Sequence, residues 1–137
     1  MRIVLQLLSG VAACGALIML ARNLSPEREL RLYALSLVIA ALIYVGFILR
    51  GAPLSWIALE LAGVVLFTLL ALPGAKVSAF LLAFAWAAHA AWDVILHKFL
   101  NVAFVPDWYP FVCVGFDLLM AGYIAVRFEK NDFGQAP

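Results

Sequence analysis

The stretch VSAFLLAFAWAAHAAWDVILHKFL, from Val77 to Leu100, combines an apolar run long enough to cross a bilayer with side chains that a bilayer disfavours. A spanning helix needs about 20 apolar residues. His89, Asp93 and His97 interrupt this run. Because a charged side chain at the centre of such a helix costs roughly 2.5–3.5 kcal/mol on insertion scales, residues of this kind usually mark a functional site.

The composition of the whole chain is that of a polytopic membrane protein. It is 67% hydrophobic and 12% charged, with a mean hydropathy of +1.08, whereas a soluble domain is roughly 45–50% apolar and about 25% charged. Its 137 residues leave room for about five spans of roughly 20 residues, with short connections. The net charge of +1 and the absence of a Lys/Arg block argue against nucleic acid as a partner.

Turn signals and polar loops divide the chain into an all-α bundle of about five transmembrane helices, in a single domain over residues 1–137. The expected spans are 3–21, 32–49, 54–72, 77–100 and 110–126, followed by a frayed polar tail, 127–137. Ser25 before Pro26 predicts a helix start, Pro73-Gly74 a helix end, and Pro110 the opening of the last helix. Arg2 and the segment Val11–Cys14 loosely fit a lipoprotein signal, but the apolar run continues past Cys14 and favours a spanning helix. Neither cysteine indicates a disulfide framework.

The distribution of Lys and Arg predicts the orientation, because cytoplasmic loops carry the excess. One side of the expected bundle holds Arg22, Arg28, Arg31, Lys76, Arg127 and Lys130. The other side holds Arg2, Arg50 and Lys98. We therefore expect a multi-pass membrane protein with the N-terminus outside and the C-terminus inside. Its expected location in a bacterial cytoplasmic (inner) membrane is what the family resemblance given below implies.

Polar residues of different spans are expected at one depth, since a helix rises about 1.5 Å per residue and neighbouring spans run in opposite directions. Counted from the outer ends of their spans, Glu60, Asp93 and Asp117 share one level. Tyr44 and Ser9 fall at that level too. The sequence therefore predicts a polar layer near the outer leaflet, to which every span contributes one group.

The fourth span carries the clearest pattern, because His89, Asp93 and His97 at i, i+4 and i+8 share one helix face. Facing bundle helices that project His and acidic residues inward can bind a divalent metal such as zinc. Two His eight residues apart lie about 12 Å from each other on a helix. A single ion is therefore expected to take adjacent members, Asp93 and His97, with Glu60 or Asp117 completing the ligand set.

Two other interpretations stay open for these residues. The same groups can bind no metal and instead transfer protons or hold a small ligand. They can also simply hydrogen-bond across helices and fix their packing, although five converging groups make packing alone the weaker explanation. His97, next to Lys98, can snorkel at the interface, and Asp107 can serve as a cap or turn residue before Pro110.

The chain resembles a family of small bacterial integral membrane proteins catalogued as a domain of unknown function. The resemblance covers nearly all of the chain from the second span onward and rests on the segments Tyr33–Phe47, Glu60–Gly63, Trp86–His97, Val105–Pro110 and Gly115–Asp117. It implies a bacterial membrane protein and no known reaction. A looser analogy, by class alone, is to membrane hydrolases that hold zinc between helices with His and Asp, but those are larger and their full motif is absent here.

The hypothesis from sequence is an intramembrane site that acts on a small or lipid-like molecule by metal or acid/base chemistry. Its metal or ligand residues are Glu60, His89, Asp93, His97 and Asp117, and its catalytic candidates are Asp93, His97, Glu60 and Asp117. The alternative is a non-enzymatic protein that handles a ligand or protons, or an accessory subunit of a membrane complex. The expected partners are the lipid bilayer, a small or lipid-like ligand, and further copies of the chain or a larger membrane complex.

Overall fold

The computed structural model describes residues 1–100 and 102–135, and helices make up most of them. These are α1 (Arg2–Ala21), α2 (Pro26–Ile48), α3 (Leu54–Val77), α4 (Ala79–Trp92), the π-helix η1 (Asp93–Phe99) and α5 (Tyr109–Glu129). With η1 continuing α4, five helices are long and apolar enough to cross a membrane. The all-α membrane architecture predicted from the sequence is thereby confirmed.

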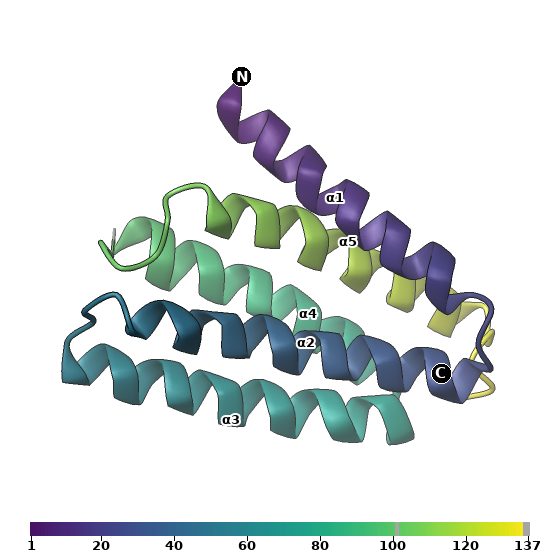
Figure 1. The fold of residues 1–137 in the computed structure, drawn as a ribbon. Helices are drawn as coiled ribbons and strands as arrows, with labels where there is room; N and C mark the ends of the chain where they lie inside the picture. The colour runs from purple at the N-terminus through teal and green to yellow at the C-terminus, as the bar shows by residue number, and fades with distance from the viewer. Residues whose placement is uncertain (101, 136–137) are drawn as a thin grey trace.

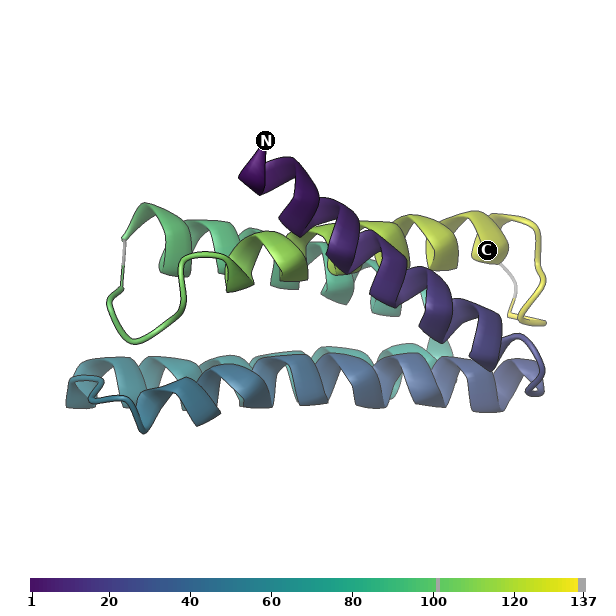
Figure 2. The ribbon, with the colours of Figure 1, turned by 45° about the horizontal axis from the view of Figure 1, so that its top comes forward.

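The helices form two layers and one outlying helix (Figures 1 and 2). Helices α2 and α3 pack on each other, α4 and α5 form the facing layer, and α1 crosses α5 on its outer side. The N-terminal part of α1 stands clear of the other helices. We call the end with the α2–α3 and α4–α5 connections the loop end, and the opposite end, with residues 127–135, the tail end.

Two glycines set the crossing of α1 and α5. A Cβ atom on Gly10 would lie 1.9 Å from the Val112 carbonyl oxygen, and one on Gly115 would lie 2.2 Å from the Leu7 carbonyl oxygen. Small residues let helix backbones approach closely in membranes, where packing rather than the hydrophobic effect drives association. The backbones of α1 and α5 are therefore in direct contact at this crossing.

The third predicted span ends too early. Helix α3 continues through Pro73 to Val77, and the chain reverses at Ser78, which has an extended backbone. A Cβ atom on Gly74 would lie 2.9 Å from the Leu82 nitrogen, so this glycine fits the tight α3–α4 corner rather than a break. A helix in lipid gains from continuing past a proline because neighbouring helices can satisfy the freed backbone group. Helix α2 begins at Pro26 with Ser25 at the N-cap position, as predicted, so it extends beyond the expected span 32–49 at its N-terminal end.

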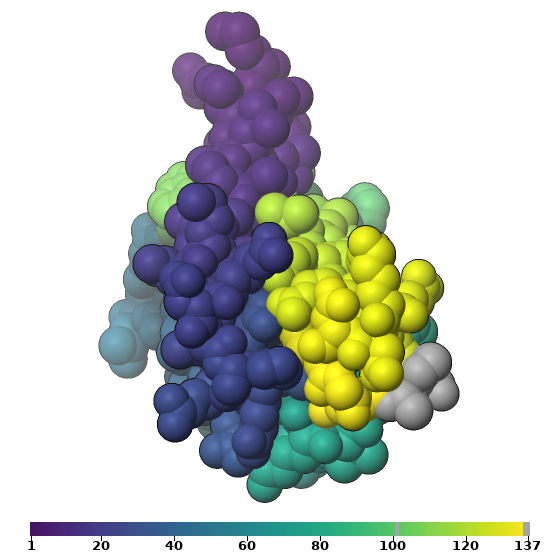
Figure 3. Space-filling model, turned by 90° about the vertical axis from the view of Figure 1, so that its right-hand side faces the viewer, coloured from purple at the N-terminus to yellow at the C-terminus, as the bar shows by residue number. Residues whose placement is uncertain are grey.

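The prediction of a frayed tail is wrong for residues Arg127–Gln135; Ala136 and Pro137 lie outside the described residues. Helix α5 continues to Glu129, and Phe133 is buried. The Gln135 amide donates to the Ala75 carbonyl at 3.4 Å, and the Ala79 amide donates to Gln135 Oε1 at 2.5 Å. The tail thus closes over the α3–α4 corner, which it covers in Figure 3.

Candidate functional site

Five buried polar side chains meet between α3, α4, η1 and α5. Glu60 comes from α3, His89 from α4, Asp93 and His97 from η1, and Asp117 from α5. None of them is more than 4% exposed. Because Glu and Asp are almost never fully buried without a partner, the contacts of each group decide what this cluster can do.

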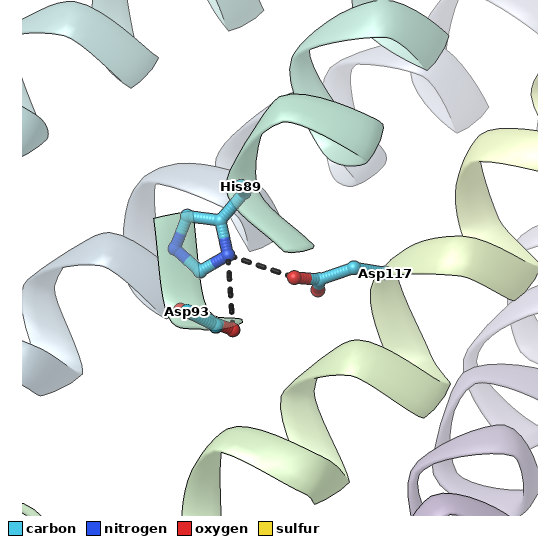
Figure 4. A group of neighbouring side chains, drawn as sticks. All are labelled: His89, Asp93 and Asp117. Carbon is cyan, nitrogen blue, oxygen red and sulfur yellow. Dashed lines mark hydrogen bonds and ion pairs between the residues drawn. The ribbon is translucent and has the colours of Figure 1, made fainter. Parts of the chain in front are cut away.

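His89 lies between two aspartates (Figure 4). Its Nδ1 is 2.8 Å from Asp117 Oδ2, a hydrogen bond, and 3.7 Å from Asp93 Oδ2. One ligand atom from each of the three residues lies within 4.8 Å of the others. The carboxylates approach from different helices, and Figure 4 shows both turned toward the same ring nitrogen.

His97 forms a second pair at the loop end of the cluster. Its Nε2 is hydrogen-bonded to Glu60 Oε1 at 2.6 Å, and its Nδ1 lies 3.9 Å from Asp93 Oδ1. One turn after Glu60, Gly63 leaves room for the Trp92 ring, which a Cβ atom would meet at 2.8 Å. This close packing of α3 on α4 keeps Glu60 within reach of His97. The five groups therefore follow one another in the order Asp117, His89, Asp93, His97 and Glu60.

Asp93, at the centre of this series, has no hydrogen-bond partner for either oxygen among the described residues. His89 Nε2, His97 Nδ1 and the Tyr44 hydroxyl are likewise buried and unpaired there. A buried polar group without a partner is costly, and each such group in a native structure calls for an explanation, such as a bound ion, water or a catalytic role. The cluster thus keeps binding capacity that its own side chains do not use.

The helix that carries Asp93 and His97 departs from the regular α-helix assumed from the sequence. Residues Asp93–Phe99 form a π-helix, in which hydrogen bonds run from i to i+5. This winding changes the angular position of His97 relative to His89, so the two imidazoles do not simply stack along one stripe. Such π segments are rare and occur frequently at functional sites.

Aromatic rings enclose the cluster. Tyr44 stacks on His97 with a centroid distance of 3.9 Å and an interplanar angle of 12°, and Phe67 meets the edge of His89 at 4.8 Å. At the loop end, Tyr44 belongs to a second apolar cluster that we call the aromatic cap. The cap consists of Tyr44, Phe47, Ala52, Trp56, Val102, Phe104, Val105 and Tyr109. It separates the polar residues from the aqueous phase at that end.

The structure contradicts the placement of Ser9 and excludes one alternative left open for His97. Ser9 does not belong to the polar layer, because it is exposed on α1 and its hydroxyl donates to the Gln6 carbonyl at 2.7 Å. Sequence spacing gave its depth but not the direction in which α1 leaves the bundle. His97 does not snorkel, because it is 4% exposed and hydrogen-bonded to Glu60. Asp107 is exposed in the turn before α5.

A second buried polar group, at the tail end, was missed by the sequence reasoning. Glu29 is 2% exposed and accepts hydrogen bonds from Arg127 at 2.5 and 2.6 Å, from Tyr33 at 2.8 Å and from Tyr123 at 3.1 Å. Its carboxylate is fully paired, so we interpret it as a clamp between α2 and α5. The only sequence signal is an acid at one helix start and an arginine at the end of another, which many surface pairs share.

Comparison with curated proteins and with solved structures gives no match. A family defined by sequence alone does match, and it covers all of the site residues and all five spanning helices except the first residues of α1. This agrees with the resemblance to an uncharacterised membrane family noted from the motifs. The chain belongs to DUF6010, a family of unknown function, which it matches over residues 5–130.

Proposed function

We propose that His89, Asp93 and Asp117 bind one divalent transition metal such as zinc inside the membrane, and that this centre acts on a small or lipid-like molecule. The observation that carries the proposal is the unpaired, fully buried Asp93 carboxylate facing the His89–Asp117 pair. This set contains three of the five metal residues expected from the sequence. It joins His89 to the two aspartates, where the spacing offered Asp93 and His97 as an example of an adjacent pair.

The distances between the three groups suit a tetrahedral ion. Metal bonds to His nitrogen and Asp oxygen of about 2.0–2.2 Å imply ligand–ligand distances of roughly 3.4 Å in a tetrahedron. His89 Nδ1 lies 3.7 Å from Asp93 Oδ2 and 2.8 Å from Asp117 Oδ2. The three ligand atoms lie within 4.8 Å of one another, so the widest pair would have to close by roughly 1–1.5 Å to admit an ion.

Charge balance supports a cation at this position. Within the part of the chain that the structure describes, no Lys or Arg forms an ion pair with Glu60, Asp93 or Asp117. Two ionised aspartates would neutralise a divalent ion, and buried charges in proteins are paired or coordinate metals. Without an ion, the three ionised carboxylates outnumber the two imidazoles, so neutrality requires a proton on at least one carboxylate even when both imidazoles are protonated.

His97 and Glu60 have a different role in this proposal. Glu60 holds the His97 ring at 2.6 Å, and the other ring nitrogen faces the second oxygen of Asp93 at 3.9 Å. A metal ion there would polarise an oxygen of the substrate or activate water. A shift of about 1 Å would bring His97 Nδ1 within hydrogen-bond distance of Asp93 Oδ1, and His97 Nε2 already shares a hydrogen bond with Glu60. The pair would then orient the Asp93 carboxylate and take up a proton released at the site.

Elemental analysis of detergent-purified protein tests the metal. We expect about one bound divalent ion per chain, loss of that ion in Asp93→Asn and Asp117→Asn, and about 10- to 100-fold weaker binding in His97→Gln, which removes a neighbouring imidazole but no proposed ligand. Asp107→Asn, which changes an exposed acid outside the cluster, serves as the control and should bind the ion as the wild type does. Wild-type protein that retains no metal after incubation with zinc, or an equal loss in His97→Gln and Asp117→Asn, would contradict the proposed ligand set.

The second candidate is a non-enzymatic protein that transfers protons or holds a small ligand, or that assists a larger membrane complex. The alternation of acid and imidazole from Asp117 to Glu60, with direct bonds at both ends, favours it. Intramembrane chains of Asp, Glu and His form proton relays in pumps and transporters. This candidate would be supported if the wild-type protein binds no metal but conducts protons across liposome membranes, and if Asp93→Asn abolishes that proton flux.

A further inference from the structure

An apolar groove runs along the lipid-facing side of the bundle to the polar cluster. It has a volume of about 270 Å³, close to the lower limit of roughly 300 Å³ for small-molecule sites. Its walls come from α1, α2 and α5, and include Leu17, Ile39, Ile43, Val112 and Phe116. Ile39 and Ile43, on its rim, are 57% and 40% exposed, so in a membrane the groove is bordered by lipid.

Five of the lining residues carry polar side-chain atoms: Ser36, Tyr109, Cys113, Asp117 and, from α4, Trp86. The Ser36 hydroxyl already donates to the Leu32 carbonyl at 2.9 Å, and Asp117 bonds His89 through its Oδ2. Trp86 also lines the groove, is fully buried, and has an indole N–H without a partner among the described residues. Since a buried Trp N–H usually finds a hydrogen-bond partner, an oxygen atom of a bound molecule would satisfy it.

The surroundings of the cluster favour entry from the bilayer. The aromatic cap closes the loop end, where Tyr44 stacks on His97 and Trp56 packs on Phe104 at 5.6 Å. The gap beside His89 that is lined by Glu60 and Phe67 is too small to hold a water molecule. The groove therefore offers a lateral approach that ends at Asp117.

We propose that this groove binds the hydrocarbon chain of an uncharged membrane amphiphile, a long-chain alcohol or ester, whose oxygen lies at Trp86 and Asp117. Apolar walls suit the chain, and the indole N–H suits a hydroxyl or ester oxygen. A phosphate or carboxylate head group is disfavoured because none of the residues that line the groove is a Lys or Arg that could pair with its charge in this poorly solvated place. That the amphiphile is the substrate of the metal centre rests on the proposed function. That the groove binds the amphiphile does not.

Photolabelling with a hexadecanol that carries a diazirine in mid-chain tests the site. In detergent-purified protein, we expect crosslinks on the groove-lining residues of α2 and α5, competed more strongly by hexadecanol than by hexadecane or hexadecyl phosphate. Ala40→Phe, which fills the groove, should lower this labelling about tenfold or more, as steric changes in apolar pockets do. Ala62→Phe, an equal change on the exposed face of α3, should leave it unchanged.

Trp86→Phe tests the polar contact separately. In a variant that keeps its helicity and elutes as a single species, the preference for hexadecanol over hexadecane should disappear while the alkane still binds. Labelling spread evenly over all lipid-facing helices, equal labelling of Ala40→Phe and wild type, or equal competition by the phosphate would overturn the proposal.

The same label separates this inference from the metal site. Asp93 does not line the groove, so metal-free Asp93→Asn should still be labelled there. Groove labelling in a protein that binds no metal would leave the amphiphile site standing and refute only the proposed function. Metal binding together with labelling spread over all lipid-facing helices would refute the amphiphile site and leave the proposed function standing.

Discussion

Asp93 and Glu29 are both almost fully buried, but only Glu29 is hydrogen-bonded. Glu29 accepts bonds from Arg127, Tyr33 and Tyr123, whereas Asp93 accepts none from the described residues. A charged group with good partners contributes to stability, while an unpaired one opposes folding and persists only for another reason. At the scale of single residues, this contrast distinguishes a structural carboxylate from one retained for function.

The contrast predicts opposite effects of two matched substitutions. Glu29→Gln should lower the free energy of unfolding by about 2–3 kcal/mol, because hydrogen bonds to a charged group are weakened and Arg127 keeps only Asp132 as an acidic partner. In metal-free protein, Asp93→Asn should leave the free energy of unfolding unchanged or raise it by up to about 1 kcal/mol, because a buried carboxylate without a partner is removed.

Thermal unfolding in detergent, followed by circular dichroism, measures both effects. Equal destabilisation by the two variants would show that Asp93 is a packing residue like Glu29. Loss of bound metal in Asp93→Asn, together with undiminished stability, is the combination expected for a ligand.

At the scale of elements, η1 determines the geometry of the polar site, and the α1–α5 crossing determines the geometry of the groove. The π winding of Asp93–Phe99 lets His97 reach Glu60 on α3 while Asp93 remains beside His89. The crossing at Gly10 and Gly115 holds α1 against α5, and Leu17 of α1 forms part of the groove wall. The position of α1 therefore bears on the groove but not on the five polar residues.

This arrangement predicts different effects of alanine at two glycines of α5. Gly115→Ala should cost about 1–3 kcal/mol of stability, because its Cβ atom meets the backbone of Leu7. Gly122→Ala should be neutral or stabilise by up to about 1 kcal/mol, since nothing lies within 4 Å and alanine is the better helix former.

Unfolding midpoints of the two variants in the same detergent provide the comparison. Metal content should be unchanged in both, because neither glycine contacts the polar cluster. If Gly115→Ala proved as stable as Gly122→Ala, the close contact between α1 and α5 would be refuted.

At the scale of the whole molecule, charge is distributed unequally between the two ends. The helix connections place Arg22, Arg28, Arg31, Lys76, Arg127 and Lys130 at the tail end. The positive-inside tendency therefore predicts a cytoplasmic tail end. In that orientation, the His89–Asp117 pair and the aromatic cap lie toward the outer half of the membrane.

Reporter fusions at the C-terminus check the orientation. We expect a fluorescent protein fused there to be fluorescent and alkaline phosphatase to be inactive, because the first matures in the cytoplasm and the second only outside it. Active phosphatase at the C-terminus would reverse the orientation.

The sequence by itself, through its composition and the spacing of its residues, determined that the chain forms spanning helices and at which depth most of its polar residues lie. Long apolar runs dictate spanning helices, because backbone groups in lipid must be satisfied within the helix. The depth argument placed Glu60, Asp93 and Asp117 at one level, because rise per residue is the same in every helix. It failed for Ser9, since depth says nothing about the side of the helix or about the angle at which α1 leaves the bundle.

Only the tertiary structure decided which polar groups meet. Spacing along the fourth span suggested Asp93 with His97, but the π winding and the approach of α5 bring His89 between Asp93 and Asp117, and Glu60 to His97. The same holds for the Glu29–Arg127 clamp and the groove at Asp117, whose members are far apart in sequence. Contacts of this kind depend on helix rotation and crossing, which are set by packing at residues such as Gly63 and Gly115 and not by local hydrophobicity.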